Sequence, residues 1–112
     1  MKKDVKIFLN HILESIENIE TFSKDITKNE FMNNRFNQNA IIRELEIIGE
    51  ASRNIPDNFR KKHSDIIWKD IIGTRDKLIH NYFGVDLEIV WDIIKNDIPK
   101  LKAGIRNILK GL

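Results

Sequence analysis

A chain of 112 residues with no cysteine, 32% charged and 41% hydrophobic residues has the composition of a single folded domain, residues 1–112, rather than of a disordered segment. The absence of cysteine excludes disulfides and thiolate metal sites, and it is typical of proteins in the reducing cytoplasm. The net charge of +2 is too small to indicate nucleic-acid binding by itself.

The first predicted element is an amphipathic helix. Apolar residues recur at steps of three and four from Val5 to Ile19, which predicts a helix that Asp4 caps and that extends to about Lys24. Charges interrupt this stretch too often for a signal peptide or a membrane span, so we expect no membrane association. The asparagine-rich residues 27–39 then predict a turn with a short helical piece.

Further helices follow along the chain. Residues 37–54 carry a broad apolar stripe, which predicts a long helix buried on more than one side, as in the middle of a bundle. Pro56 can start a short helix that extends to Lys62. A third long helix is expected from Ser64 to Tyr82 or Phe83, with Gly84 just after its end.

The last predicted helix begins after Asp86, which is placed to cap it. Pro99 must kink or restart this helix because proline has no backbone N–H to donate. No stretch shows the sustained alternation of a strand. The expected fold is therefore all-α, an antiparallel bundle of four to five helices.

Cations gather in residues 95–112, where five basic residues face a single acidic one, Asp97. The five are Lys95, Lys100, Lys102, Arg106 and Lys110. One interpretation is a solvated helical surface whose cations suit the C-terminal end of the helix dipole. The other is a weak flank that attracts phosphate groups.

Arg75 stands out in the third long helix because it lies on the apolar face. With ~100° between successive residues, Trp68 and Tyr82 both fall within about 20° of Arg75. A buried guanidinium without a partner is costly, so three arrangements are open. Arg75 can pair with Glu44 or Glu50 of the preceding long helix, reach a bundle edge, or face a polar pocket shared with a second subunit.

His80 lies about 140° around the same helix from Arg75, so one helix cannot easily point both side chains at one small group. Two copies related by a two-fold axis could do so. Taken alone, His80 is more often a surface or capping histidine, and Tyr82 is more often a core tyrosine with a bonded hydroxyl. His11 and Glu14 are three residues apart, but no matching second pair predicts a metal site, and His63 lies in a basic turn.

Arg75, His80 and Tyr82 form the pattern Arg-x4-His-x-Tyr, which resembles the signature of the HepT-like toxins of the HEPN superfamily. The resemblance extends through IIGTRDKLIHNYFGVDLEIVWDIIKNDIP, residues 71–99, and AIIRELEIIGEAS, residues 40–52. It implies a bundle of four or five helices, usually a homodimer. It also implies a metal-independent endoribonuclease without a cofactor, and a minimal nucleotidyltransferase antitoxin that adenylylates Tyr82.

The resemblance assigns catalytic roles to Arg75 and His80, with Asp76 and Tyr82 in support. Arginine binds phosphate oxygens as a fork and keeps its charge, whereas histidine exchanges protons near neutral pH. Two other hypotheses remain open at this stage. The chain could be an inactive helical module that docks a nucleotidyltransferase, or a structural helical protein in which Arg75 forms a salt bridge.

Overall fold

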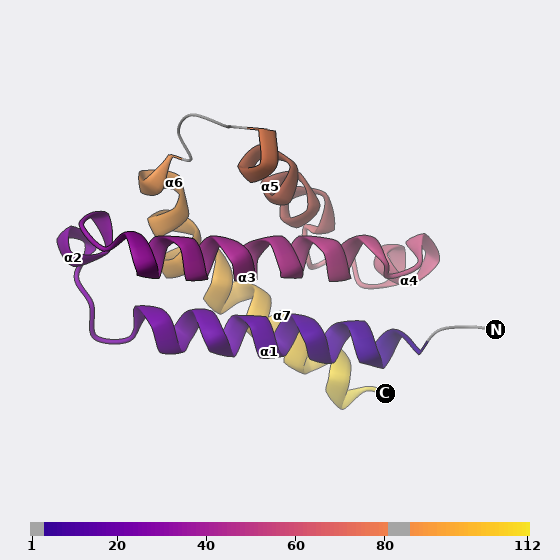
Figure 1. Ribbon diagram of the computed structural model, residues 1–112. Coiled ribbons are helices and arrows are strands. Elements are labelled where there is room, and N and C mark those ends of the chain that lie inside the picture. Colours follow the sequence, from indigo (N-terminus) through magenta and orange to yellow (C-terminus); the bar gives the residue numbers. More distant parts are fainter. Residues whose placement is uncertain (1–3, 81–85) are drawn as a thin grey trace.

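The computed structural model describes residues 4–80 and 86–112, and side chains for all of these except residues 75–80. No strand occurs in these two ranges, and the helices pack as an antiparallel bundle, which confirms the predicted fold class (Figure 1). The helices are α1 (Val5–Ser23), α2 (Lys28–Met32), α3 (Arg35–Arg53), α4 (Asp57–Lys62), α5 (Trp68–His80), α6 (Leu87–Asp92), the π-helical η1 (Ile93–Asp97) and α7 (Ile98–Lys110).

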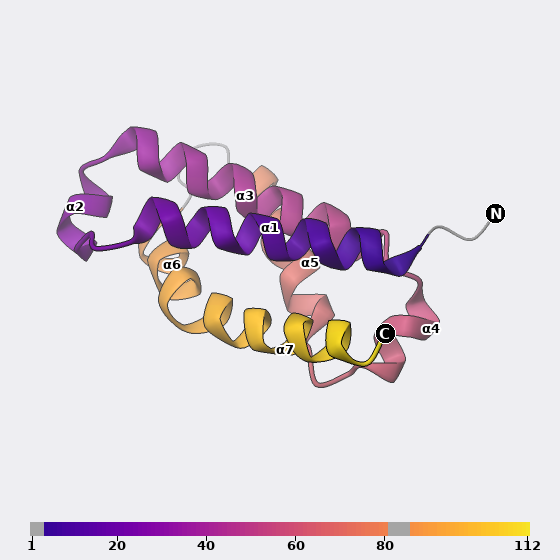
Figure 2. The same ribbon diagram turned by 90° about the horizontal axis from the view of Figure 1, so that it is seen from below.

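The bundle is built around α1 and α3, which lie side by side and run in opposite directions (Figures 1 and 2). α3 packs against α5, and α7 packs against α1, so α1 and α3 each contact two long helices. This central position explains the broad apolar stripe of α3. The core consists of fully buried aliphatic side chains from these helices, among them Leu9, Ile12, Ile16, Ile41, Ile48 and Ile105.

Side-chain caps fix several helix ends, as the sequence predicted. The Asp4 carboxylate accepts from the backbone N–H of Lys6 at the start of α1. Asp86 accepts from the N–H groups of Glu88 and Ile89 at the start of α6. The short helix predicted after Pro56 is α4. Such ends can be read from sequence because the cap and the N–H groups that it satisfies are close neighbours.

Two predicted boundaries shift. α3 begins at Arg35, two residues earlier than predicted, because Asn34 accepts from the N–H of Asn37 and caps it. α5 begins at Trp68 and not at Ser64, so the predicted start is wrong. Residues 63–67 turn instead, with the N–H of Ile66 donating to the carbonyl of His63. The predicted end of α5 at Tyr82 or Phe83, and the role of Gly84, lie outside the described residues.

Pro99 restarts the last helix, one of the two outcomes predicted for it. The π-helical turn η1 precedes it, and the Ile98 N–H donates to the Ile93 carbonyl five residues back. Pro99 then lies in the first turn of α7, where no intrahelical donor is needed. η1 and the first turns of α7 face the N-terminal half of α5 across a cavity.

Candidate functional site

The predicted catalytic residues lie at the C-terminal end of α5. Arg75, Asp76 and His80 belong to one helix that runs without interruption from Trp68 to His80. Their backbone positions therefore keep the separation of about 140° between Arg75 and His80 that the sequence predicts. The directions of these side chains, and the position of Tyr82, lie outside the described residues, so their convergence stays a prediction.

The N-terminal half of α5 is firmly attached to the bundle. The Trp68 side chain is 6% exposed, and its indole N–H donates to the His63 carbonyl at 3.0 Å. Ile71 packs against the core, whereas Asp70 is exposed. The apolar stripe on which Arg75 was placed is thus confirmed for the part of the helix that precedes it.

α3 contributes the carboxylates that were considered as partners for Arg75. Glu44 is 8% exposed and accepts from the Asn18 amide of α1, with Nδ2–O distances of 3.2 and 3.4 Å. Glu50 is exposed and lines a groove between α1 and α3 together with His11 and Arg43. The pairing of Arg75 with Glu44 or Glu50 stays a prediction.

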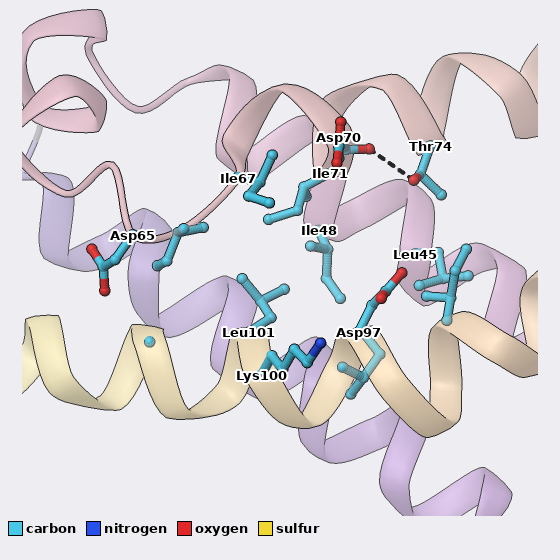
Figure 3. A pocket seen from close by; sticks show the side chains of 14 residues that line it. Leu45, Ile48, Asp65, Ile67, Asp70, Ile71, Thr74, Asp97, Lys100 and Leu101 are labelled. Carbon is cyan, nitrogen blue, oxygen red and sulfur yellow. Dashed lines mark hydrogen bonds between the residues drawn. The ribbon is translucent and has the colours of Figure 1, made fainter.

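A cavity of about 320 Å³ lies between α3, α5 and the η1–α7 segment (Figure 3). Its wall is mostly apolar, with Leu45 and Ile48 from α3, Ile71 from α5 and Leu101 from α7. Polar side chains join these at the edge: Asp65, Asp70, Thr74, Asp97 and Lys100. Sequence reasoning missed this cavity, because its lining comes from helices far apart in the chain and no local pattern marks it.

Asp97 is the described carboxyl whose titration is most clearly altered. Partial burial raises its pKa above the ordinary value of 3.8, and the negative charge of Asp92 raises it further. Asp70, on the α5 side, acts in the same direction, whereas the ammonium of Lys100 lowers the pKa. The carboxylates of Asp92 and Asp70 thus add negative charge near Asp97, and Lys100 partly offsets it.

The basic C-terminal segment is partly engaged within the molecule. The Lys102 ammonium lies 2.7 Å from a carboxylate oxygen of Glu20, and the Lys95 ammonium lies 4.6 Å from the centre of the Trp91 ring. Lys100 lines the cavity. Two of the five cations thus contact other side chains of the chain, which favours the interpretation as helical surface over a phosphate-attracting flank.

The remaining histidines have ordinary surroundings. The His63 ring packs against Phe59, with ring centres 4.5 Å apart, at the C-terminal end of α4. His11 is exposed on α1. Within the described residues, no group of three or more histidine, aspartate or glutamate side chains is arranged to hold a metal ion. In the same part of the chain, no helix combines the length and apolar character that a membrane crossing requires.

Comparison with known proteins adds independent information. The chain matches the family model described as "Ribonuclease HepT-like" over residues 12–108. It is 54% identical over its whole length to "Gamma-glutamylcyclotransferase and putative RNase MJ0434" of Methanocaldococcus jannaschii, but it spans only 50% of that protein.

Two further relatives match the chain along almost their full length. The chain is 52% identical to "Putative RNase MJ1380" of the same organism, over 93% of the chain and 95% of the relative. It is 46% identical to "Probable ribonuclease HepT" of Thermococcus cleftensis, over 98% of the chain and 100% of the relative. No solved structure matches the chain.

Proposed function

The chain belongs to the ribonuclease HepT-like family, and we propose that it is an endoribonuclease acting in the cytoplasm as the toxin of a toxin–antitoxin pair. The observation that carries this proposal is the family match over residues 12–108, which includes all of α5 with Arg75 and His80. The relatives named as ribonucleases, which align with nearly the whole chain, support the same activity.

The proposed reaction is cleavage of RNA by its own 2′-hydroxyl group. The 2′-oxygen attacks the adjacent phosphorus, the bond to the 5′-oxygen breaks, and the products carry a 2′,3′-cyclic phosphate and a 5′-hydroxyl. His80 moves the proton, as the base for the 2′-hydroxyl or the acid for the leaving 5′-oxygen. Arg75 holds the charge that develops on the phosphoryl oxygens, because its guanidinium is permanently charged and offers a fork of donors.

We place the site at the interface of a homodimer. Arg75 and His80 are about 140° apart on one helix, so two copies of α5 facing each other would bring both residue types to one phosphate more readily than one copy. Asp76 orients Arg75 or His80, and the Tyr82 hydroxyl lies beside the substrate. The reaction as written needs no metal ion, since the nucleophile belongs to the RNA itself.

We further propose that a minimal nucleotidyltransferase antitoxin silences the enzyme at Tyr82. The tyrosine oxygen attacks the α-phosphorus of ATP and pyrophosphate leaves, so that an adenylyl group becomes attached to the side chain. The added bulk and negative charge beside Arg75 then exclude RNA. Mass spectrometry of the toxin after incubation with the antitoxin and ATP tests this step, with Tyr82→Phe as the unmodified control.

Cleavage of cellular RNA by the purified protein in the presence of EDTA tests the activity. Arg75→Ala and His80→Ala should each abolish cleavage without changing helix content, whereas Lys69→Ala, an exposed position earlier on α5, should not. Intact RNA with a folded wild-type protein would refute the ribonuclease and favour a module that docks a nucleotidyltransferase.

Mixing experiments test the shared site. Arg75→Ala and His80→Ala proteins, each inactive alone, should regain part of the wild-type activity when they are re-equilibrated together, because a mixed dimer then has one site with Arg75 from one subunit and His80 from the other. No activity in the mixture, with mixed dimers present, would mean that each subunit has a complete site of its own.

A further inference from the structure

The cavity between α3, α5 and α7 has the size and lining of a small-molecule site. Its volume of about 320 Å³ is at the lower end of the range for ligand pockets, and such pockets are mostly apolar with a few polar groups. Ile48 and Leu101 are almost fully buried at its wall, so the apolar surface lies inside the bundle. Figure 3 shows the side chains of α3, α5 and α7 around this space.

One contact at the wall depends on a glycine. A Cβ atom on Gly104 of α7 would lie 2.8 Å from Cγ1 of Ile66 and 3.0 Å from its Cδ1. Both residues line the cavity, and the missing side chain at Gly104 gives Ile66 its place against α7. The cavity is therefore bounded by a close helix-to-loop contact and is not merely a gap between loosely placed helices.

Among the side chains that the structure describes, the charge at the cavity edge is unbalanced. Asp65, Asp70 and Asp97 contribute three carboxylates, and Lys100 contributes one ammonium. Within the described residues, none of these four side chains forms an ion pair or a hydrogen bond. Partial burial is the main cause of the raised pKa of Asp97, and the negative charges of Asp92 and Asp70 add to it against the opposing charge of Lys100. A positive charge brought between Asp70 and Asp97 would offset the excess of carboxylates.

We propose that this cavity binds an organic ammonium compound, with its apolar body against Ile48, Ile71 and Leu101 and its charged nitrogen between Asp70 and Asp97. The apolar wall favours an alkyl or aromatic body, because the apolar surface of the ligand leaves water when it binds. The carboxylate excess selects a cation over a neutral or anionic molecule of the same shape. None of these residues has a role in the proposed ribonuclease, whose first assigned residue, Arg75, follows Thr74 of the cavity edge on α5.

Three ligands with the same six-carbon chain separate the contribution of apolar contact from that of charge: hexylamine, hexanol and hexanoate. Binding to the full chain is measured by calorimetry and by chemical shifts of the Ile48 and Leu101 methyl groups. Hexylamine should bind more tightly than hexanol by about three- to tenfold, the range expected for a partly solvated charge contact, and hexanoate should bind most weakly. The difference between amine and alcohol should shrink as salt is added.

Variants test whether Asp70 and Asp97 bind the ammonium group of the ligand. Asp70→Asn with Asp97→Asn should bring the affinity for hexylamine down to that for hexanol while the affinity for hexanol stays unchanged. Both positions are exposed, so the variant is expected to fold. Asp25→Asn is the matched control, because Asp25 has a left-handed backbone (φ 60°) that asparagine also accepts and it does not line this cavity.

Three outcomes would overturn the proposal. Equal affinity for the amine and the alcohol would leave an apolar cavity without selectivity for cations. Hexylamine binding without shifts at Ile48 and Leu101 would place the ligand elsewhere. If none of the three ligands binds to a protein with wild-type helix content, the cavity is closed to ligands. Ultracentrifugation then tests for a second copy as the cover: the wild type would be a dimer and the Ile67→Lys variant a monomer.

Discussion

The side-chain amide of Asn18 on α1 donates to both carboxylate oxygens of Glu44 on α3, at 3.4 and 3.2 Å. This link joins the two central helices of the bundle, and Glu44 is only 8% exposed. A buried carboxylate needs such a partner because it leaves water on folding. Glu44 is thus part of the bundle's internal structure, whatever further contact it makes with α5.

Asn18→Ala should therefore destabilise the protein by about 1–3 kcal/mol, the cost of leaving a buried polar group without its donor. Replacing both residues, as in Asn18→Leu with Glu44→Leu, should recover most of this loss because no charge then remains buried. Urea unfolding measures the change. Asn96→Ala is the control, since the Asn96 amide bonds to Asp92 at an exposed position, and a change as large as that of Asn18→Ala would contradict the argument.

Gly104→Ala tests the contact between α7 and Ile66. Alanine favours a helix by about 1 kcal/mol over glycine, but a Cβ placed 2.8 Å from Ile66 Cγ1 forces the side chain to move, at about 1–3 kcal/mol. We expect a net loss of about 1 kcal/mol in the free energy of unfolding. In an Ile66→Ala background the same change should become stabilising, because the clash is gone.

Gly111→Ala is the matched control for Gly104→Ala. At Gly111 the nearest atom to an added Cβ is the Ile108 carbonyl oxygen at 3.5 Å, an ordinary contact. Its effect should stay within about 0.5 kcal/mol. Equal effects of the two alanines in urea unfolding would show that the contact with Ile66 does not limit residue 104.

The sequence predicted what depends on neighbouring residues and missed what depends on distant ones. The caps at Asp4 and Asp86 and the restart at Pro99 follow from chemistry within a few residues, and all three are present. The start of α5 was missed because a hydrogen bond from the Trp68 indole to His63 stabilises a turn where helical periodicity continues. The cavity was missed because α3, α5 and α7 form it jointly.

The candidate catalytic residues were found by a different route. Periodicity singled out Arg75 as a cation on an apolar face, and the part of that face that the structure describes is indeed packed, with Trp68 buried. Their chemistry came from the resemblance to a family, and the family is confirmed. The convergence that we propose for Arg75, His80 and Tyr82 cannot follow from one chain's periodicity, because in this proposal it depends on the arrangement of two copies.

Trp68→Phe tests how α5 is held at its N-terminal end. The change removes the indole N–H that donates to His63 and some buried ring surface, so the free energy of unfolding should fall by about 1–2 kcal/mol. Hydrogen exchange should accelerate first in α5. The control is Trp91→Phe, because the Trp91 indole N–H makes no hydrogen bond within the described residues. Unchanged exchange in α5 would argue against this anchor.

Asp97 should make stability depend on pH. Its pKa is raised in the folded state, so between the unfolded value of 3.8 and the higher folded value the native protein binds more protons than the unfolded chain. The free energy of unfolding therefore loses a contribution as the pH rises through this window, and the loss is complete at neutral pH. Asp97 is exposed, so solvent screening keeps this contribution small.

Asp97→Asn removes this contribution, because asparagine does not titrate. The variant should match the wild type at low pH and become slightly more stable above the window, as measured by urea unfolding at a series of pH values. Asp92→Asn should reduce the same dependence, since the charge of Asp92 is the second cause of the raised pKa. A variant less stable than the wild type at neutral pH would show that the Asp97 carboxylate stabilises the fold by contacts that outweigh its burial.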